Sequence, residues 1–452
     1  MKQIRAAQLS CVFSRGWGGV FGFFLLSMSI GSASSTPDRE EFLRIATQAG
    51  DWTLSREVQV PNDGGSYFPS RSDLSPEDKG NLYYGNAGIL LFFRELYQTT
   101  GRPEYAEAIK RGARFLNKNI SDLKLYGLYD GLAGIAFSLA QFPEDPAAAA
   151  GCSRALGRLA LERSHDQNGG TRWNNDNDVI SGSAGVGLTL LALGRQLERP
   201  DLIDLAVQAG TDLLAVGQTT SHGRYWFHEL KSGRQYPNFS HGTAGIAFFL
   251  LRLYEETGEN RFLVAALDGA HYLQSIASVD PPSRCLIPHD LPGGETLFYL
   301  SWCHGPAGTG RFFHELSIVT RDPDWQRLCD ASAQTMIDLG VPEHHTRGYW
   351  DNVSRCCGAV GMGEYFLARF RASKQPSDRQ LALRIAEYLS RAAEPEGGGL
   401  KWTQAENRIE PDNLLAQTGL MQGAAGIGLF FLHVARSDDD DKDSLPLPDS
   451  SW

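Results

Sequence analysis

Three cysteines in this chain stand just before paired glycines, a place where a thiol could bind a metal. They are Cys303 in Ser-Trp-Cys-His-Gly, and the adjacent Cys356 and Cys357 in Arg-Cys-Cys-Gly. A Ser-His-Gly segment places His241 at a comparable position. A single buried cysteine is usually only a small apolar side chain, but thiolate and imidazole are ligands that suit Zn²⁺. These residues form a site only if the fold brings their distant segments together.

The glycines beside these residues belong to a Gly-x-x-Gly phrase that occurs seven times. It begins at Gly85, Gly131, Gly182, Gly242, Gly305, Gly358 and Gly423. Successive first glycines are 46 to 65 residues apart, which is room for two helices and their connections. An apolar stretch follows each phrase, such as Ile246-Ala-Phe-Phe-Leu250. We therefore predict seven hairpins of helices, each with one helix that begins at the paired glycines.

The second helix of several hairpins carries small residues four positions apart, which lie on one helical face and allow close approach of a neighbour. The pairs are Ala108 and Gly112, Ala206 and Gly210, and Ala265 and Gly269. No stretch alternates apolar and polar residues convincingly enough to compete as a major strand. The sequence predicts an all-α fold, an α/α toroid (barrel) of seven helical hairpins with an inner and an outer ring of helices.

Such a toroid makes residues at equivalent repeat positions converge on its centre. Cys303, Cys356 and Cys357 then meet at helix N-termini, where the helix dipole and free N–H groups favour thiolates. Three thiolates suit Zn²⁺, and a catalytic zinc keeps its fourth position open. For most of the glycines, packing alone is a sufficient explanation. Three further cysteines lack such a placement and are expected to be structural: Cys152, Cys285 and Cys329.

The composition of the chain excludes some classes of function. The 452 residues carry a formal net charge of −11, whereas a domain that grips phosphate backbones is usually basic, so we expect no nucleic-acid partner. The apolar content of 42% and charged content of 21% are ordinary for a soluble globular protein. Seven cysteines at irregular spacing do not indicate a disulfide scaffold.

Both ends of the chain differ from the repeat region, which we place at residues 38–436. A basic stretch, an apolar run from Val20 to Ile30 and small residues up to Ala33 are typical of a signal peptide over residues 1–33. We therefore expect an exported protein, secreted or periplasmic, or a cytoplasmic one if the start codon is mis-assigned. An acidic run followed by Leu-Pro-Leu-Pro predicts a disordered tail over residues 437–452.

The seven phrases, with Trp-Cys-His-Gly in the fifth and Cys-Cys-Gly in the sixth, resemble the lanthionine synthetase C-like family. The resemblance covers about residues 40 to 435. It implies an α/α toroid whose central zinc is held by Cys303, Cys356 and Cys357. The family usually has a histidine where this chain has Cys357, although a minority of related cyclase domains use three cysteines. A third thiolate adds one negative charge, so a bound substrate thiolate would be less neutralised and more nucleophilic.

The resemblance also implies a reaction, the addition of a cysteine thiol to dehydroalanine or dehydrobutyrine to form a thioether. Zinc would lower the pKa of the thiol, and the enolate that forms would need a proton donor. His241 matches the family's active-site histidine, and Asp178 resembles its acidic residue ahead of the third phrase. A histidine beside a carboxylate suits acid–base work, whereas the simpler interpretation makes His241 a helix cap and Asp178 a turn residue.

Two pocket residues follow from the same resemblance. The family often carries a histidine at the place of His304 without using it as a ligand, so we expect a pocket role there. Several family cyclases have an arginine shortly before Trp-Cys, where this chain reads Leu297-Phe-Tyr-Leu-Ser301. We expect enolate stabilisation to come from elsewhere, for example from Arg355.

The expected partners are a dehydrated peptide or protein substrate and, for thiol addition between molecules, glutathione. No segment resembles a dehydratase, so a cyclase would need a separate dehydratase, and we expect a monomer. Two other functions stay open. A non-catalytic scaffold stabilised by zinc would show a closed site with His304 or His241 as a fourth ligand. A carbohydrate-active hydrolase or lyase would use paired carboxylates such as Asp130 and Asp178, and it leaves the cysteines unexplained.

Overall fold

The structure is a computed structural model that describes residues 36–450, except 63, 73, 76, 168, 280–283, 344–351 and 438–443. The signal peptide expected at residues 1–33 lies outside the described residues. From Pro37 to Trp452 the chain forms one compact unit. Among the described residues, no helix has both the length and the hydropathy that a membrane span needs.

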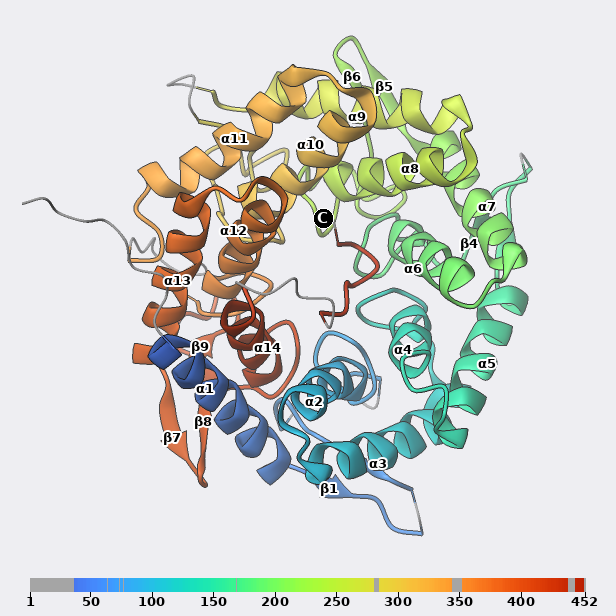
Figure 1. The fold of residues 1–452 in the computed structure, drawn as a ribbon. Coiled ribbons are helices and arrows are strands. Elements are labelled where there is room, and N and C mark those ends of the chain that lie inside the picture. Colours follow the sequence, from blue (N-terminus) through green and yellow to red (C-terminus); the bar gives the residue numbers. More distant parts are fainter. Residues whose placement is uncertain are drawn as a thin grey trace, which may run out of the picture. The chain divides into compact units, whose positions relative to one another are not determined.

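Seven apolar helices form a closed inner ring in this unit (Figure 1). They are α2 (Asn86–Thr100), α4 (Leu132–Leu139), α6 (Ser183–Gln196), α8 (Thr243–Thr257), α10 (Pro306–Thr320), α12 (Ala359–Ser373) and α14 (Ala424–Ala435). Each helix contacts the next one in this order, and α14 contacts α2, which closes the ring. The first glycine of each Gly-x-x-Gly phrase is the N-cap of one of these helices.

Seven further helices lie outside the inner ring. They are α1 (Thr36–Ser55), α3 (Pro103–Asn119), α5 (Pro146–Leu161), α7 (Pro200–Val216), α9 (Asn260–Ile276), α11 (Pro323–Asp338) and α13 (Pro376–Arg391). Each helix from α3 to α13 packs against the inner helix that precedes it. The seventh pair joins the two ends of the unit, because Phe42 of α1 packs on Phe431 of α14 with ring centroids 5.8 Å apart. The predicted α/α toroid of seven helix pairs is therefore confirmed.

Proline marks the start of five outer helices, α3, α5, α7, α11 and α13. Its fixed φ suits the first helical turn, and the N–H that it lacks would have no partner there. Short two-stranded antiparallel sheets follow some outer helices. The pairs are β1 (Val58–Gln59) with β2 (Ser66–Tyr67), β3 (Ser164–His165) with β4 (Thr171–Arg172), β5 (Gln218–Thr220) with β6 (Gly223–Tyr225), β7 (Glu394–Glu396) with β8 (Gly399–Lys401), and β9 (Thr403–Ala405) with β10 (Leu414–Ala416).

Three of these strand segments attach to the end of the outer helix before them through a buried tryptophan. The indole N–H of Trp173 donates to Leu159 O at 2.8 Å, that of Trp226 to Leu213 O at 2.7 Å and that of Trp402 to Leu389 O at 2.8 Å. Each bond satisfies a carbonyl at the C-terminal end of a helix, where no intrahelical donor remains. The strands are thus accessories of the helix pairs, and they build no sheet of their own in the core.

The second glycine of every phrase is explained by a backbone contact. A Cβ at any of the seven positions would lie 1.9 to 2.4 Å from the carbonyl oxygen of the residue six positions earlier. No side chain fits at that separation. The chain can therefore turn tightly into each inner helix only if this position is glycine, which is the packing role expected for most of these glycines.

The segments before the inner helices are joined by a closed ring of seven backbone N–H···O hydrogen bonds, each 2.9 to 3.1 Å long. In donor-to-acceptor order they are Tyr83 to Tyr129, Tyr129 to Ile180, Val179 to Ser240, Ser240 to Cys303, Cys303 to Cys356, Cys356 to Met421, and Met421 to Tyr83. Apart from Val179, each of these residues stands two positions before the first glycine of its phrase. We call this set the backbone ring; it gathers the N-terminal ends of all seven inner helices around one centre.

Part of the segment expected to be a disordered tail is packed in the structure. Residues 444–450 lie inside the inner ring (Figure 1), and Leu447 and Asp449 are buried. The N–H of Leu445 donates to Glu95 Oε1 at 3.1 Å, and Tyr129 Oη donates to Asp449 Oδ1 at 3.0 Å. The polar composition of this segment did not predict that it packs inside the inner ring. The groups that it contacts there, Glu95 and Tyr129, are themselves polar. Residues 438–443, which contain most of the acidic run, lie outside the described residues.

Candidate metal centre and active site

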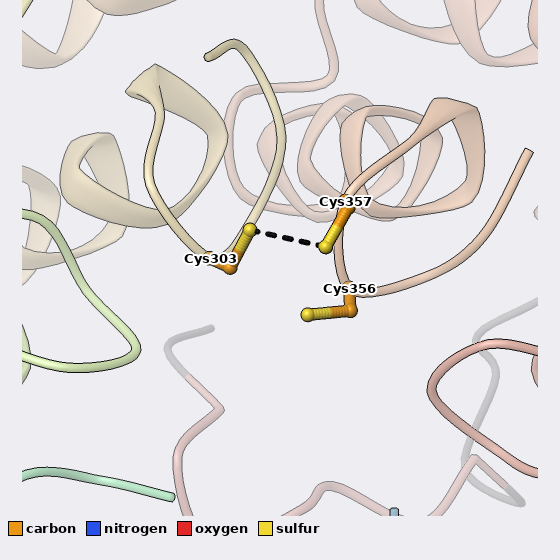
Figure 2. A group of neighbouring side chains, drawn as sticks. All are labelled: Cys303, Cys356 and Cys357. Carbon is orange, nitrogen blue, oxygen red and sulfur yellow. Dashed lines mark hydrogen bonds between the residues drawn. The ribbon is translucent and has the colours of Figure 1, made fainter. Parts of the chain in front are cut away.

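The three cysteines expected to bind metal meet at one place on the backbone ring (Figure 2). Their Sγ atoms all lie within 4.8 Å of one another, and Sγ of Cys303 is 3.4 Å from Sγ of Cys357. Cys303 precedes α10, while Cys356 and Cys357 precede α12, and the bond from Cys303 N–H to Cys356 O joins the two segments. All three side chains are buried free thiols.

This donor set fits Zn²⁺ in both distance and charge. Tetrahedral bonds of about 2.3 Å place sulfur atoms about 3.8 Å apart, close to the separations found here. Burial raises the pKa of Cys356 and of Cys357. At Cys303 the cost of burial is outweighed by hydrogen bonds from the other two thiols, which hold its pKa well below the usual range. The site alone thus favours a single thiolate, and a divalent cation is what would stabilise three.

Polar groups beside the sulfur atoms support the same assignment. Gln422 Nε2 donates to Cys357 Sγ at 3.7 Å, and Ser301 Oγ lies 3.5 Å from Cys303 Sγ. Contacts of this kind orient ligands and stabilise their charge. Helices α10 and α12 begin shortly after Cys303 and Cys357, respectively. The dipoles of these helices favour negative charge at their N-termini, where the thiols lie.

His304 lies beside the thiols and is not part of the group of mutually close donor atoms. Among the described residues that group consists of the three cysteines alone. His304 is buried against His289, with ring centroids 4.1 Å apart, and its Nδ1 has no hydrogen-bond partner among the described residues. Burial lowers the pKa of His304 well below the usual value, so the ring is neutral.

A second cluster lies on the adjoining part of the backbone ring, around Asp178. This carboxylate is fully buried, and its Oδ2 lies 2.6 Å from Nδ1 of His241 and 3.3 Å from Nε2 of His228. Its Oδ1 accepts from the N–H groups of Ser181 and Gly182 at 2.9 and 2.8 Å. Burial alone would raise the pKa of Asp178, but the hydrogen bonds and charges of the two histidines hold it well below its usual range. Asp178 is therefore ionised at neutral pH.

This arrangement fixes the orientation of His241. Because ionised Asp178 can only accept, Nδ1 of His241 carries the proton of their shared hydrogen bond, and Nε2 is left for the pocket. His228 shares the same carboxylate. Sequence analysis did not predict it, because this residue does not stand next to a Gly-x-x-Gly phrase. Burial would lower the pKa of His228, but the hydrogen bond and charge of Asp178 outweigh burial and raise it.

One cavity of about 250 Å³ brings these groups together. It is lined by the three cysteines, His241, His304 and Asp130, together with neighbouring residues of the first and third repeats. Arg355 lines a different cavity, inside the inner ring, where its Nη1 lies 3.4 Å from Glu364 Oε1 and residues of the C-terminal segment are nearby. The structure therefore does not support the expectation that Arg355 stabilises an enolate, because its charge is directed into the ring interior.

The fold and the cavity define the class of protein: an α/α toroid with a three-thiol cluster where its inner helices begin. A family model described as "Lanthionine synthetase C-like protein" matches residues 76–447. The chain belongs to the lanthionine synthetase C-like family, as the resemblance in its repeats predicted.

Solved structures with a similar fold include nisin cyclase, at 15% identity and a TM-score of 0.62, over 90% of this chain and 95% of that one. The Lin0763 protein from Listeria innocua is similar at 12% identity and a TM-score of 0.54, over 90% and 99% of the two chains. A GH76 α-mannanase from Bacteroides thetaiotaomicron follows at 10% identity and a TM-score of 0.49, over 90% and 97%. At these identities the likeness to nisin cyclase and to the Lin0763 protein shows the fold alone. The comparison with curated proteins finds no match.

Proposed function

We propose that this protein is a zinc-dependent enzyme that adds a cysteine thiol to dehydroalanine or dehydrobutyrine in a peptide or protein. The observation that carries the proposal is the three-thiol cluster, which shares one cavity with a histidine held by a buried carboxylate. Family membership supports a cyclase or thiol-adding type of chemistry. The thiol belongs to the peptide itself or to glutathione, and a separate dehydratase supplies the dehydrated residue.

The residues of the cavity divide this work. Cys303, Cys356 and Cys357 would hold the zinc, which when bound lowers the pKa of a substrate thiol and favours its thiolate. Asp178 keeps His241 in one tautomer and one orientation, so that Nε2 can exchange a proton with the reacting groups. The three cysteines and His304 are buried, so their side of the cavity limits water around the substrate and strengthens the electrostatic interactions there.

The two alternative functions are less well supported. A scaffold with a structural zinc would have four protein ligands, whereas the described donor cluster contains neither His304 nor His241. A glycoside hydrolase would need a pair of carboxylates free to act on a sugar. Asp178 is fully buried, and both of its oxygens are occupied by hydrogen-bond donors, so it is not available for that role.

Zinc content of the purified, reduced chain tests the metal centre. We expect about one zinc per chain in the wild type and in the control Cys152→Ala, which removes a buried cysteine far from the cluster in sequence. We expect little or no zinc in Cys303→Ala and Cys357→Ala. The zinc-loaded protein should then form a thioether with a dehydroalanine peptide, as measured by mass spectrometry. A wild-type chain that binds no zinc when reduced and supplied with the metal would contradict the proposal.

A further inference from the structure

Asp130 is an acidic residue of the cavity to which the proposed function gives no role. It stands immediately before Gly131, the same repeat position that His241 and Cys357 occupy before their own glycines. Its side chain lines the cavity together with the three cysteines and His241. An acid at this place can therefore reach the same substrate as the thiols.

Asp130 and the thiols stand on different sides of the cavity. In the order of the backbone ring, the second repeat lies across from the fifth and sixth repeats, which carry the cysteines. The two sides are in contact next to these residues, because Tyr129, which precedes Asp130, and Trp302, which precedes Cys303, have ring centroids 5.3 Å apart. A single residue of a bound peptide would lie between the thiols and the carboxyl group.

The surroundings of Asp130 favour its neutral form. Protein encloses the side chain on almost every side, and it keeps only partial contact with solvent. Its Oδ1 is buried against Gly127 and has no hydrogen-bond partner among the described residues, a costly situation for a charged oxygen. Asp176 and Asp178 add negative charge, while the other titratable groups of the cavity wall include Asp78, Tyr84 and His241.

Burial is the largest contribution, a hydrogen bond with Ser181 opposes it, and with the charges of the two carboxylates burial raises the pKa of Asp130 to about 7. Asp130 is thus about half protonated at neutral pH, while Asp178, in the same region of the protein, is ionised there. Two carboxyl groups with opposite tendencies are the arrangement that separates an acid from a supporting base.

We propose that Asp130 is the acid that protonates the α-carbon after thiol addition. The proposal rests on the proposed function. The thiol gives its proton to Nε2 of His241, and its sulfur forms a bond to Cβ of the dehydro residue. The C=C π bond breaks and its electrons form an enolate, to which the Asp130 carboxyl group delivers a proton at Cα. Solvent then returns a proton to Asp130 and removes one from His241, so the sum is the addition of S–H across C=C.

The same placement predicts the stereochemistry of the product. Sulfur arrives from the side of the cysteines and the proton arrives from the side of Asp130. The two therefore add to opposite faces of the double bond. A reaction in deuterated water should place deuterium at Cα on the face opposite to sulfur.

Asp130→Asn is the central variant, because it keeps the shape of the protonated acid and removes the proton. Wild-type kcat should fall as pH rises above about 7, because Asp130 then loses its proton. In the variant kcat should be lower by about 100-fold or more, and it should no longer decline at high pH. The matched control is Asp176→Asn, the same substitution at a neighbouring carboxylate. Asp176→Asn removes a negative charge near Asp130 and so lowers the pKa of Asp130. This variant should keep most of kcat, and its decline in kcat should begin at a lower pH.

Two readouts do not depend on activity. Carbon-13 NMR of aspartate-labelled protein should show a carboxyl group that titrates near neutral pH and is missing from Asp130→Asn, and zinc content should be the same in both proteins. Wild-type kcat and an unchanged pH profile in Asp130→Asn would overturn the role of Asp130. Failure of the wild type to form any thioether would instead overturn the proposed function.

Discussion

At the scale of single residues, two aspartates near one cavity differ in charge because their partners differ. Asp178 accepts hydrogen bonds from two backbone N–H groups and lies against His241 and His228. Asp130 has a hydrogen bond with Ser181, but its buried Oδ1 has no donor among the described residues and two carboxylates lie close by. Hydrogen bonds to the charged form lower a pKa, whereas burial and nearby negative charge raise it. Residue type alone therefore says little about the role of either side chain.

Asp178→Asn tests how far His241 depends on its carboxylate. The variant keeps the size of the side chain, but it no longer stabilises a positively charged imidazole and can hold His241 in the wrong tautomer. We expect kcat to fall by about 100- to 10,000-fold. Zinc content should not change, because Asp178 is not in the donor cluster. Steady-state kinetics and metal analysis, with the exposed Asp201→Asn as control, would check this; an unaffected kcat would contradict it.

Sequence reasoning predicted that residues of the candidate site lie together wherever the repeat carried them, and the structure places them around one cavity. Cys303, Cys356, Cys357 and His241 all stand one or two positions before a first glycine, so equivalence of the repeats placed them near one centre. His228 was missed because it contacts Asp178 from a loop between β6 and α8 that belongs to no phrase. Arg355 stands three positions before Gly358, and its side chain lies beside Glu364 in the ring interior instead of lining the cavity of the candidate site.

At the scale of elements, the chemistry of the cavity is set at one position of the repeat. Of the seven residues that immediately precede a first glycine, five line the cavity: Tyr84, Asp130, His241, His304 and Cys357. The backbone ring fixes the direction of this position in each repeat. Different side chains can therefore occupy the position while the helices behind it stay the same.

The glycine contacts give a matched pair of stability tests. In Gly134→Ala the new Cβ would lie 1.9 Å from Leu128 O, so the start of α4 must shift. We expect a loss of about 2–4 kcal/mol in the free energy of unfolding. Gly157→Ala in α5 is the control, because nothing lies within 4 Å of the new Cβ and alanine favours the helix. Urea denaturation would measure both, and equal effects would contradict the backbone-contact explanation.

The sequence predicted the helices well, because the paired glycines occur before every inner helix and proline before most outer ones. It did not predict the short strand pairs, whose strands are two or three residues long. Three of these strand segments are held to a helix end by a single tryptophan contact. Periodicity cannot reveal elements of that length.

At the scale of the whole molecule, the C-terminal segment is a structural part of the toroid. The N–H of Leu445 donates a hydrogen bond to Glu95, and Asp449 accepts one from the hydroxyl of Tyr129. Burial combined with the charge of Asp449 raises the pKa of Tyr129 well above its usual value, so this tyrosine stays a donor. The C-terminal segment thus lies inside the inner ring of helices and contacts Tyr129, a residue of the backbone ring.

Deletion of residues 444–452 should therefore destabilise the whole unit. It leaves Glu95 and the Tyr129 hydroxyl with fewer partners in a buried place, and each such loss costs about 1–3 kcal/mol. We expect a loss of roughly 2–5 kcal/mol in the free energy of unfolding, measured by urea denaturation. Asp449→Asn keeps an acceptor for Tyr129 and should lose less. Unchanged stability in the deleted chain would show that the segment contributes nothing.

The closure of the backbone ring has a consequence for how the protein is made. Met421 donates to Tyr83 and accepts from Cys356, so a segment from the last repeat completes the enclosure around thiols synthesised earlier. Contacts between distant parts of a chain form late, since loop closure must precede them. Until α14 has left the ribosome and packed between α12 and α2, the nascent chain carries Cys303, Cys356 and Cys357 without their finished surroundings. Under the proposed function, metal capture during biosynthesis would therefore compete with oxidation of these thiols.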